Sequence, residues 1–172
     1  MPIYIRGNMI LANIDWGTVT DLKLLFTRLV RLEIELWDAL DARLKHDAGI
    51  ALRDYLPMQT IATTKSCRVY HLMEQIGVTV GTASKAVDRL EAAGYCQRTD
   101  DPGDRRSPII TLTTEGIVVL AKATNSIDAE LRLRFDAAAT PAAIEQLAGT
   151  IDALLARGEE TRHAQRRPRH HD

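Results

Sequence analysis

The chain has 172 residues, a hydrophobic content of 45% and a formal net charge of −1. This length and composition fit one packed domain with a flanking extension, and no apolar run approaches the roughly 20 residues that a membrane-spanning helix needs. Because the whole chain carries no basic field, any affinity for nucleic acid must come from a local cluster of cations.

The first predicted elements are an N-terminal arm and a long amphipathic helix. Residues 1–17 show no clear period. From about Val19 to His46, leucines and other apolar residues recur at steps of three and four, the pattern of a helix with one apolar face. Such a helix is either an ordinary core helix or packs partly on a second subunit. Its length of about seven turns favours the second subunit.

Three shorter helices are predicted next. The first covers 57–64, with Pro57 in its opening turn, and the second covers 70–76 and ends at Gly77, which adopts the left-handed conformation without strain. Between them, residues 67–69 are predicted as a very short strand or an extended link. A third helix follows a tight turn, with Thr79 as its expected N-cap, and should bury one face, formed by Val80, Ala83, Val87 and Leu90. Two helices joined by a tight turn form a helix-turn-helix, whose second helix enters the DNA major groove.

The other faces of this third helix carry small, hydroxyl and basic side chains. Thr82 and Ser84 can approach base edges or phosphates, and Lys85 follows them. Arg89, one turn later, is better placed for a phosphate. An ordinary surface helix has similarly scattered polar residues. This helix alone therefore fits a DNA-reading helix and an ordinary surface helix equally well.

A β-hairpin is predicted after this helix, which ends at Gly94. Its strands cover 95–99 and 108–112, and Pro102-Gly103 between them is a strong turn signal. The order helix, strand, turn, strand is that of a winged helix-turn-helix.

The charges of the hairpin favour a contact with DNA. Arg98, Arg105 and Arg106 would cluster on it, and an arginine at a wing tip can reach the narrow minor groove, where the potential is most negative. Asp100, Asp101 and Asp104 partly cancel this charge, and they are expected to hold an arginine side chain in place by a bidentate contact. The alternative is a solvated hairpin with weak surface ion pairs.

Two more helices complete the predicted elements. One begins at residues 113–116 and runs to about Arg134, and the last has Thr140 as its N-cap and Pro141 as its first residue. Residues 158–172 are polar and basic and have no apolar side chains around which to fold, so we predict that they are disordered.

The sequence contains no motif typical of an enzyme active site or a metal site. Cys67 and Cys96 have no C-x-x-C spacing, and their predicted positions favour structural thiols over redox sensors. The histidines form no ligand pair with a carboxylate. With no nucleophile motif or phosphate loop, we expect no enzyme, no metal and no cofactor. The cysteine usage fits a reduced, cytoplasmic protein without a membrane partner.

The central stretch resembles a known family. The run I-G-V-T-V-G-T-A-S-K-A-V-D-R-L-E-A-A-G-Y-C-Q-R, then D-R-R, then L-T-T-E-G, is similar to the MarR-type winged helix-turn-helix transcriptional regulators. The similarity is strongest over 76–116 and covers roughly 18–157. It implies a mostly α fold with a small antiparallel β wing. Residues 18–50 and 117–157 would be dimerisation helices, and residues 51–116 would be the DNA-binding lobe.

The resemblance also implies a function. Members of this family are homodimers that bind pseudo-palindromic double-stranded DNA, as repressors often relieved by a small aromatic or phenolic ligand. Thr82, Ser84 and Lys85 would then lie in the major groove, and Arg106, with Arg105, at the minor groove. The ligand would bind between the dimerisation helices and the DNA-binding lobe, near Trp16, Trp37, His46 and Tyr55.

Two features leave an alternative open. The net charge is close to neutral, and Gly81 stands where the family usually has a larger or hydroxylated residue. The alternative is a dimeric ligand-sensing or protein-interaction module that has the same fold and does not bind DNA.

Overall fold

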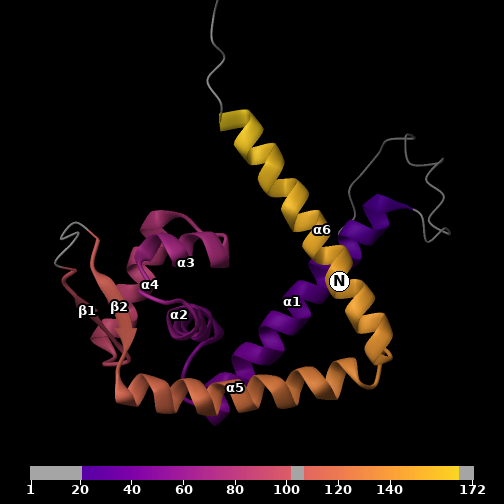
Figure 1. The fold of residues 1–172 in the computed structure, drawn as a ribbon. Coiled ribbons are helices and arrows are strands. Elements are labelled where there is room, and N and C mark those ends of the chain that lie inside the picture. Colours follow the sequence, from indigo (N-terminus) through magenta and orange to yellow (C-terminus); the bar gives the residue numbers. More distant parts are fainter. Residues whose placement is uncertain (1–20, 102–106, 167–172) are drawn as a thin grey trace, which may run out of the picture.

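The computed structural model describes residues 21–101 and 107–166, so Trp16, Asp104, Arg105 and Arg106 lie outside the described residues. The fold is mostly helical with one small antiparallel sheet, and the predicted fold class is confirmed (Figure 1). Its elements in chain order are α1 Leu22–Asp47, α2 Leu52–Thr63, α3 Val69–Ile76, α4 Val80–Ala92, β1 Cys96–Thr99, β2 Ile109–Leu112, α5 Thr114–Phe135 and α6 Pro141–Arg166.

The helix ends follow short-range chemistry that is visible in the sequence. Thr79 caps α4 by accepting a hydrogen bond from the Thr82 backbone N–H at 3.2 Å. Thr140 caps α6 through the Ala143 N–H at 3.4 Å. Gly77 ends α3 with a φ of 75°, in the left-handed region. The caps expected at Thr79 and Thr140 and the stop expected at Gly77 are confirmed.

The start of α2 was predicted wrongly. The helix begins at Leu52, and Pro57 lies inside it and is buried. The reason is a cap from another helix, because the Asp41 side chain on α1 accepts the Leu52 N–H at 2.8 Å. Because proline has no backbone N–H, Pro57 cannot make the helical hydrogen bond to the Arg53 carbonyl.

The predicted disorder after residue 157 is also wrong in part. Helix α6 continues to Arg166, although residues 158–166 offer no apolar face. Once a helix is nucleated, each further residue adds one backbone hydrogen bond, and Glu, Ala, Gln and Arg are favourable in helices. After Gly158 the sequence has no glycine or proline until Pro168.

The core lies in the lobe formed by α2, α3, α4 and the two strands, and it includes the end of α1 and the middle of α5. Its largest fully buried side chains are Leu44, Cys67, Met58, Leu72, Val87, Leu90 and Ile110. Val80 was expected on the buried face of α4 but is 57% exposed, because it is the first residue of the helix and projects beyond the packed turns. Among the described residues, none from α6 belongs to this core.

The two strands pair antiparallel, with Cys96 opposite Leu112 and Thr99 opposite Ile109. The segment before α3 extends this pairing, because the Cys67 carbonyl accepts the Ile110 N–H at 2.8 Å. The extended link predicted before α3 therefore pairs with β2 through Cys67 and connects α3 to the wing. Helix α5 leads away from the wing and packs along α1, and α6 projects away from the lobe (Figure 1).

Candidate nucleic-acid interface

The first turns of α4 present the side chains that the sequence assigns to base reading. Thr82 and Lys85 are exposed, and Ser84 is half-buried. The Thr82 and Thr79 hydroxyl oxygens lie 2.9 Å apart and share a hydrogen bond, so the cap also orients Thr82. A Cβ added at Gly81 would have no heavy atom within 4 Å, so this end of the helix is open.

Arg89 lies on α4 but its side chain is directed at α2. Its Nη2 and Nε lie 3.1 Å and 3.2 Å from Asp54 Oδ1, and its Nη1 donates to the Lys85 carbonyl at 3.3 Å. A phosphate contact would have to share the guanidinium with this carboxylate. The contact with DNA therefore stays a prediction, and the ion pair joins α4 to α2.

Arg98 is directed from β1 back to α4. Its Nη2 lies 2.6 Å from Asp88 Oδ1, its Nη1 donates to Glu91, and its backbone N–H donates to Glu91 Oε1 at 3.2 Å. Burial lowers the pKa of Arg98, but the two carboxylates outweigh this effect and the net shift is upward. The structure thus gives Arg98 a bracing position between the wing and α4, and its expected contact with DNA stays a prediction.

Arg68 is a residue that sequence reasoning missed. From the position just before α3, its side chain forms an ion pair with Asp101, with Nη2 2.5 Å from Oδ2, and donates to the Ser107 carbonyl. No local pattern indicates this contact, because Arg68 and Asp101 are 33 residues apart in the chain. An aspartate of the turn was expected to hold an arginine, and among the described residues Asp101 does so.

The segment Leu112 to Gly116 ties three elements together at the start of α5. The Thr113 hydroxyl donates to the Gly94 carbonyl at 2.7 Å, and the Thr113 N–H donates to the Tyr95 carbonyl at 3.0 Å. The same hydroxyl accepts the Gly116 N–H at 3.0 Å and so caps α5. The end of α4 and the start of the wing are therefore fixed to the first turn of α5.

An apolar pocket of about 580 Å³ lies between α1, α2 and α5. We call it the α1–α5 pocket. Trp37 and Tyr55 both line it, and the Tyr55 hydroxyl lies 3.5 Å from Thr124 Oγ1. Glu33, Gln59 and Asp128 are the other polar residues of a lining that is otherwise formed by Leu29, Leu32, Leu36, Leu40, Leu52, Leu56, Ile127 and Leu131.

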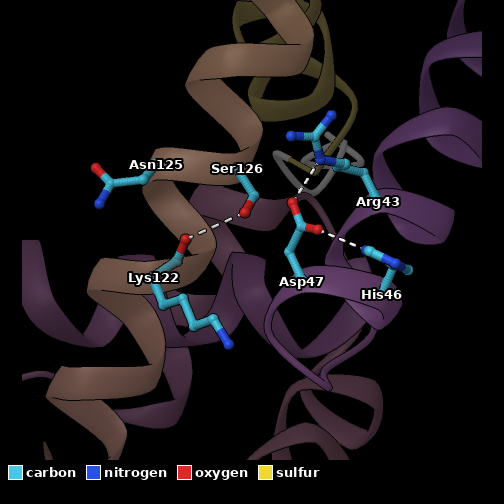
Figure 2. A pocket seen from close by; sticks show the side chains of 6 residues that line it. All are labelled: Arg43, His46, Asp47, Lys122, Asn125 and Ser126. Carbon is cyan, nitrogen blue, oxygen red and sulfur yellow. Dashed lines mark hydrogen bonds and ion pairs between the residues drawn. The ribbon is translucent and has the colours of Figure 1, made fainter.

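His46 does not join Trp37 and Tyr55. It lines a separate, wide opening of about 510 Å³ together with Arg43, Asp47, Lys122, Asn125 and Ser126 (Figure 2). His46 Nδ1 lies 2.7 Å from Asp47 Oδ1, and Arg43 also pairs with this carboxylate. Hydrogen bonds from His46, Arg43 and Ser126 hold the pKa of Asp47 well below its usual range. The expected ligand set is thus divided between two openings.

Both cysteines are buried in the core. Burial, with a smaller contribution from the Glu91 charge, raises the pKa of the Cys96 thiol to about 11, and burial also raises the pKa of Cys67. These surroundings disfavour the reactive thiolate, in agreement with structural thiols. Over residues 21–101 and 107–166, no group of three or more His, Cys, Asp or Glu side chains is arranged to hold a metal ion. In the same residues, no helix is both long and apolar enough to cross a bilayer.

Residues 51–107 match the model of the MarR family. Among solved structures, the chain is similar to a MarR family transcriptional regulator from Streptomyces coelicolor in complex with DNA, with 28% identity, a TM-score of 0.72, and coverage of 82% of this chain and 89% of that chain. It also has the fold of CouR from Rhodococcus jostii bound to p-coumaroyl-CoA, with 23% identity, a TM-score of 0.67, and coverage of 78% and 92%.

The fold is also that of the transcriptional regulator BldR from Sulfolobus solfataricus, with 23% identity, a TM-score of 0.72, and coverage of 81% of this chain and 99% of that chain. No curated protein matches the sequence. The matched residues 51–107 span the helix-turn-helix and the first strand of the wing. The resemblance found in the sequence is therefore confirmed: residues 51–107 match the MarR family model, and the chain has the winged helix-turn-helix fold of a MarR family transcriptional regulator.

Proposed function

We propose that this protein is a homodimeric, cytoplasmic repressor that binds a pseudo-palindromic operator and responds to a small aromatic ligand. The observation that carries the DNA-binding half is the placement of the wing beside an exposed α4. Arg98 joins β1 to α4, and Arg68 joins the base of the wing to α3. An open α4 reads bases with its first turns, while the wing reaches the adjacent minor groove.

The apolar surfaces of α1 and α6 support a homodimer. Phe26 on α1 is 66% exposed and Leu154 on α6 is 61% exposed, and both helices carry further exposed leucine and isoleucine side chains. Many large apolar side chains exposed on the same helices are typical of an interaction site. A second copy of the chain would bury them and would place two α4 helices on one DNA duplex, as a pseudo-palindrome requires.

The α1–α5 pocket supports a ligand. Its volume of about 580 Å³ and its apolar lining fit a small aromatic molecule, with Trp37 and Tyr55 available for stacking. The pocket lies between the proposed dimerisation helices and the DNA-binding lobe. A molecule bound there could change the spacing of the two α4 helices and so release the operator.

One observation favours a second candidate, a dimeric sensing module that does not bind DNA. Arg68, Arg89 and Arg98, three arginines of the lobe, are each paired with carboxylates. A lobe neutralised in this way attracts phosphates weakly. If the dimer protects no DNA in a genome-wide footprint, this second function is supported and the repressor proposal fails.

Replacing Arg106 by alanine should weaken operator binding by more than tenfold, or about 1.4 kcal/mol, because the wing loses its minor-groove contact. The measurement is a gel-shift titration on a genomic fragment that the wild-type protein selects. The control is Arg53→Ala, which removes the same charge from a 70% exposed side chain on α2, outside the proposed dimer interface, and should leave binding unchanged. Equal affinities for Arg106→Ala and wild type would contradict the assignment of the wing.

Binding of an aromatic ligand should change the fluorescence of Trp37. Replacing Trp16 by phenylalanine leaves Trp37 as the sole tryptophan of the chain, and this protein can be titrated with p-coumaric acid and p-coumaroyl-CoA. We expect a saturable change that weakens in Tyr55→Phe. The change should persist in His46→Ala, because His46 lines a different opening. A flat titration with both probes would contradict binding of this ligand class.

A further inference from the structure

Arg68 occupies an unusual position between the helix-turn-helix and the wing. Its own backbone N–H donates to His71 Nδ1 at 3.0 Å, which fixes the first turn of α3. The carbonyl of the preceding Cys67 accepts the Ile110 N–H of β2 at 2.8 Å. The main chain around Arg68 is therefore anchored both to α3 and to the second strand of the wing.

The side chain of Arg68 contacts the two residues that flank the wing tip, which we define as residues 102–106. Its guanidinium pairs with Asp101, which follows β1, and donates to the Ser107 carbonyl, which precedes β2. Residues 102–106 lie between these two contacts in the sequence. The Arg68 side chain is only 16% exposed and that of Asp101 only 25%, so water screens this ion pair less than a surface pair.

Contacts from the Arg68 guanidinium to both Asp101 and Ser107 restrict the wing. The planar fork of arginine holds its donors in fixed directions, so the two wing strands are kept at one separation and one orientation relative to α3. A wing fixed in this way loses less conformational freedom when it binds DNA than a wing that moves independently. This effect acts on affinity without any contact between Arg68 and DNA.

We propose that Arg68 is a positioning residue for operator binding, which holds the base of the wing so that the tip meets the minor groove while α4 lies in the major groove. This inference rests on the proposed function. It assigns to Arg68 an effect that passes through the wing tip and therefore depends on the tip arginine Arg106. Arg68 is a more suitable residue than Arg98 for this role, because Arg98 braces one strand and Arg68 holds both ends of the tip.

A double-mutant cycle tests the proposal. Operator affinity is measured for wild type, Arg68→Met, Arg106→Ala and the double variant, with methionine chosen because it keeps an unbranched apolar stem without the charge. We expect Arg68→Met to weaken binding about tenfold. The double variant should bind with the same affinity as Arg106→Ala alone. Arg68 is proposed to act only through the contact of Arg106 with DNA, so its replacement has no further effect once that contact is lost. Additive losses would overturn the proposal, and so would unchanged affinity in Arg68→Met.

Two further variants separate positioning from general damage to the lobe. Arg53→Met removes a 70% exposed arginine from α2 in the same lobe, and it should leave both affinity and melting temperature unchanged. Asp101→Asn removes the charge of the other partner in the ion pair. It should lower operator affinity as Arg68→Met does, and this decrease should also be non-additive with that of Arg106→Ala. If Asp101→Asn folds and binds like wild type, the ion pair does not position the wing.

The outcome also separates this inference from the proposed function. A wild-type protein that selects no genomic DNA would overturn both. A wild-type protein that binds its operator with a steep salt dependence, while the cycle shows additive losses, would keep the repressor and overturn the role of Arg68.

Discussion

Replacing Gly116 by alanine should destabilise the winged-helix lobe by about 3 kcal/mol, the largest effect that we expect from a single methyl group in this chain. A Cβ at this position would lie 2.0 Å from the Tyr95 carbonyl oxygen and 2.9 Å from its carbonyl carbon. Neither atom can rotate away as a side chain would. Thr113 holds the same segment, through its N–H to Tyr95 and its hydroxyl to Gly94.

This result can be measured by urea denaturation followed by circular dichroism. Gly81→Ala is the matched control, since Gly81 also lies in a helix of the lobe and a Cβ there meets no atom within 4 Å. We expect Gly81→Ala to keep or raise the free energy of unfolding by up to about 1 kcal/mol. Equal stability of Gly116→Ala and wild type would show that the close approach is not a constraint of the fold.

Features that depend on interactions between residues close in the chain could be predicted from the sequence, and features that depend on long-range interactions could not. The caps at Thr79 and Thr140 and the stop at Gly77 depend on atoms within a few residues, so they could be predicted from the sequence. The start of α2 could not, because Asp41 caps Leu52 from another helix, 11 residues earlier. The same holds for Arg68 and Asp101, which the fold brings together across 33 residues.

The candidate site was predicted in part for the same reason. The order of α4 and the wing has a local signature, and so does the L-T-T-E-G segment, whose glycine is required by the backbone of Tyr95. The partners of the arginines have no such signature. The contacts of Arg89 and Arg98 with DNA stay predictions, and each of these arginines pairs with carboxylates that the sequence pattern does not indicate. The sequence shows where an arginine stands in the chain, but the tertiary fold determines which carboxylate its side chain contacts.

These ion pairs also bear on the near-neutral charge of the chain. Carboxylates that hold Arg68 and Arg98 in place lower the net charge, but they fix the geometry of the wing. These ion pairs therefore weaken the non-specific attraction of the lobe to phosphates and make its interface more rigid. Rigid, pre-organised surfaces gain specificity because less freedom is lost on binding. Net charge alone is consequently a weak argument against DNA binding in this protein.

The second large effect is expected from a charge placed in the proposed dimer interface. The double variant Phe26→Glu and Leu154→Glu changes one exposed apolar side chain on α1 and one on α6. Burial of each original side chain against a second copy would stabilise the dimer by about 2 kcal/mol, whereas a buried glutamate without a partner costs free energy. We expect a folded monomer whose operator affinity falls by about a hundredfold or more, because the two half-sites are no longer bound together.

Sedimentation equilibrium gives the oligomeric state, and a gel-shift titration on the same operator gives the affinity. Tyr70→Glu is the matched control, because Tyr70 is a 47% exposed apolar side chain on α3, outside both predicted dimerisation segments. It should leave the dimer intact. A double variant that remains dimeric would place the interface elsewhere, and a monomer with unchanged affinity would contradict binding to a two-fold operator. A monomer that has lost affinity, beside a dimeric control, is the outcome expected if α1 and α6 hold the two lobes at the spacing of the half-sites.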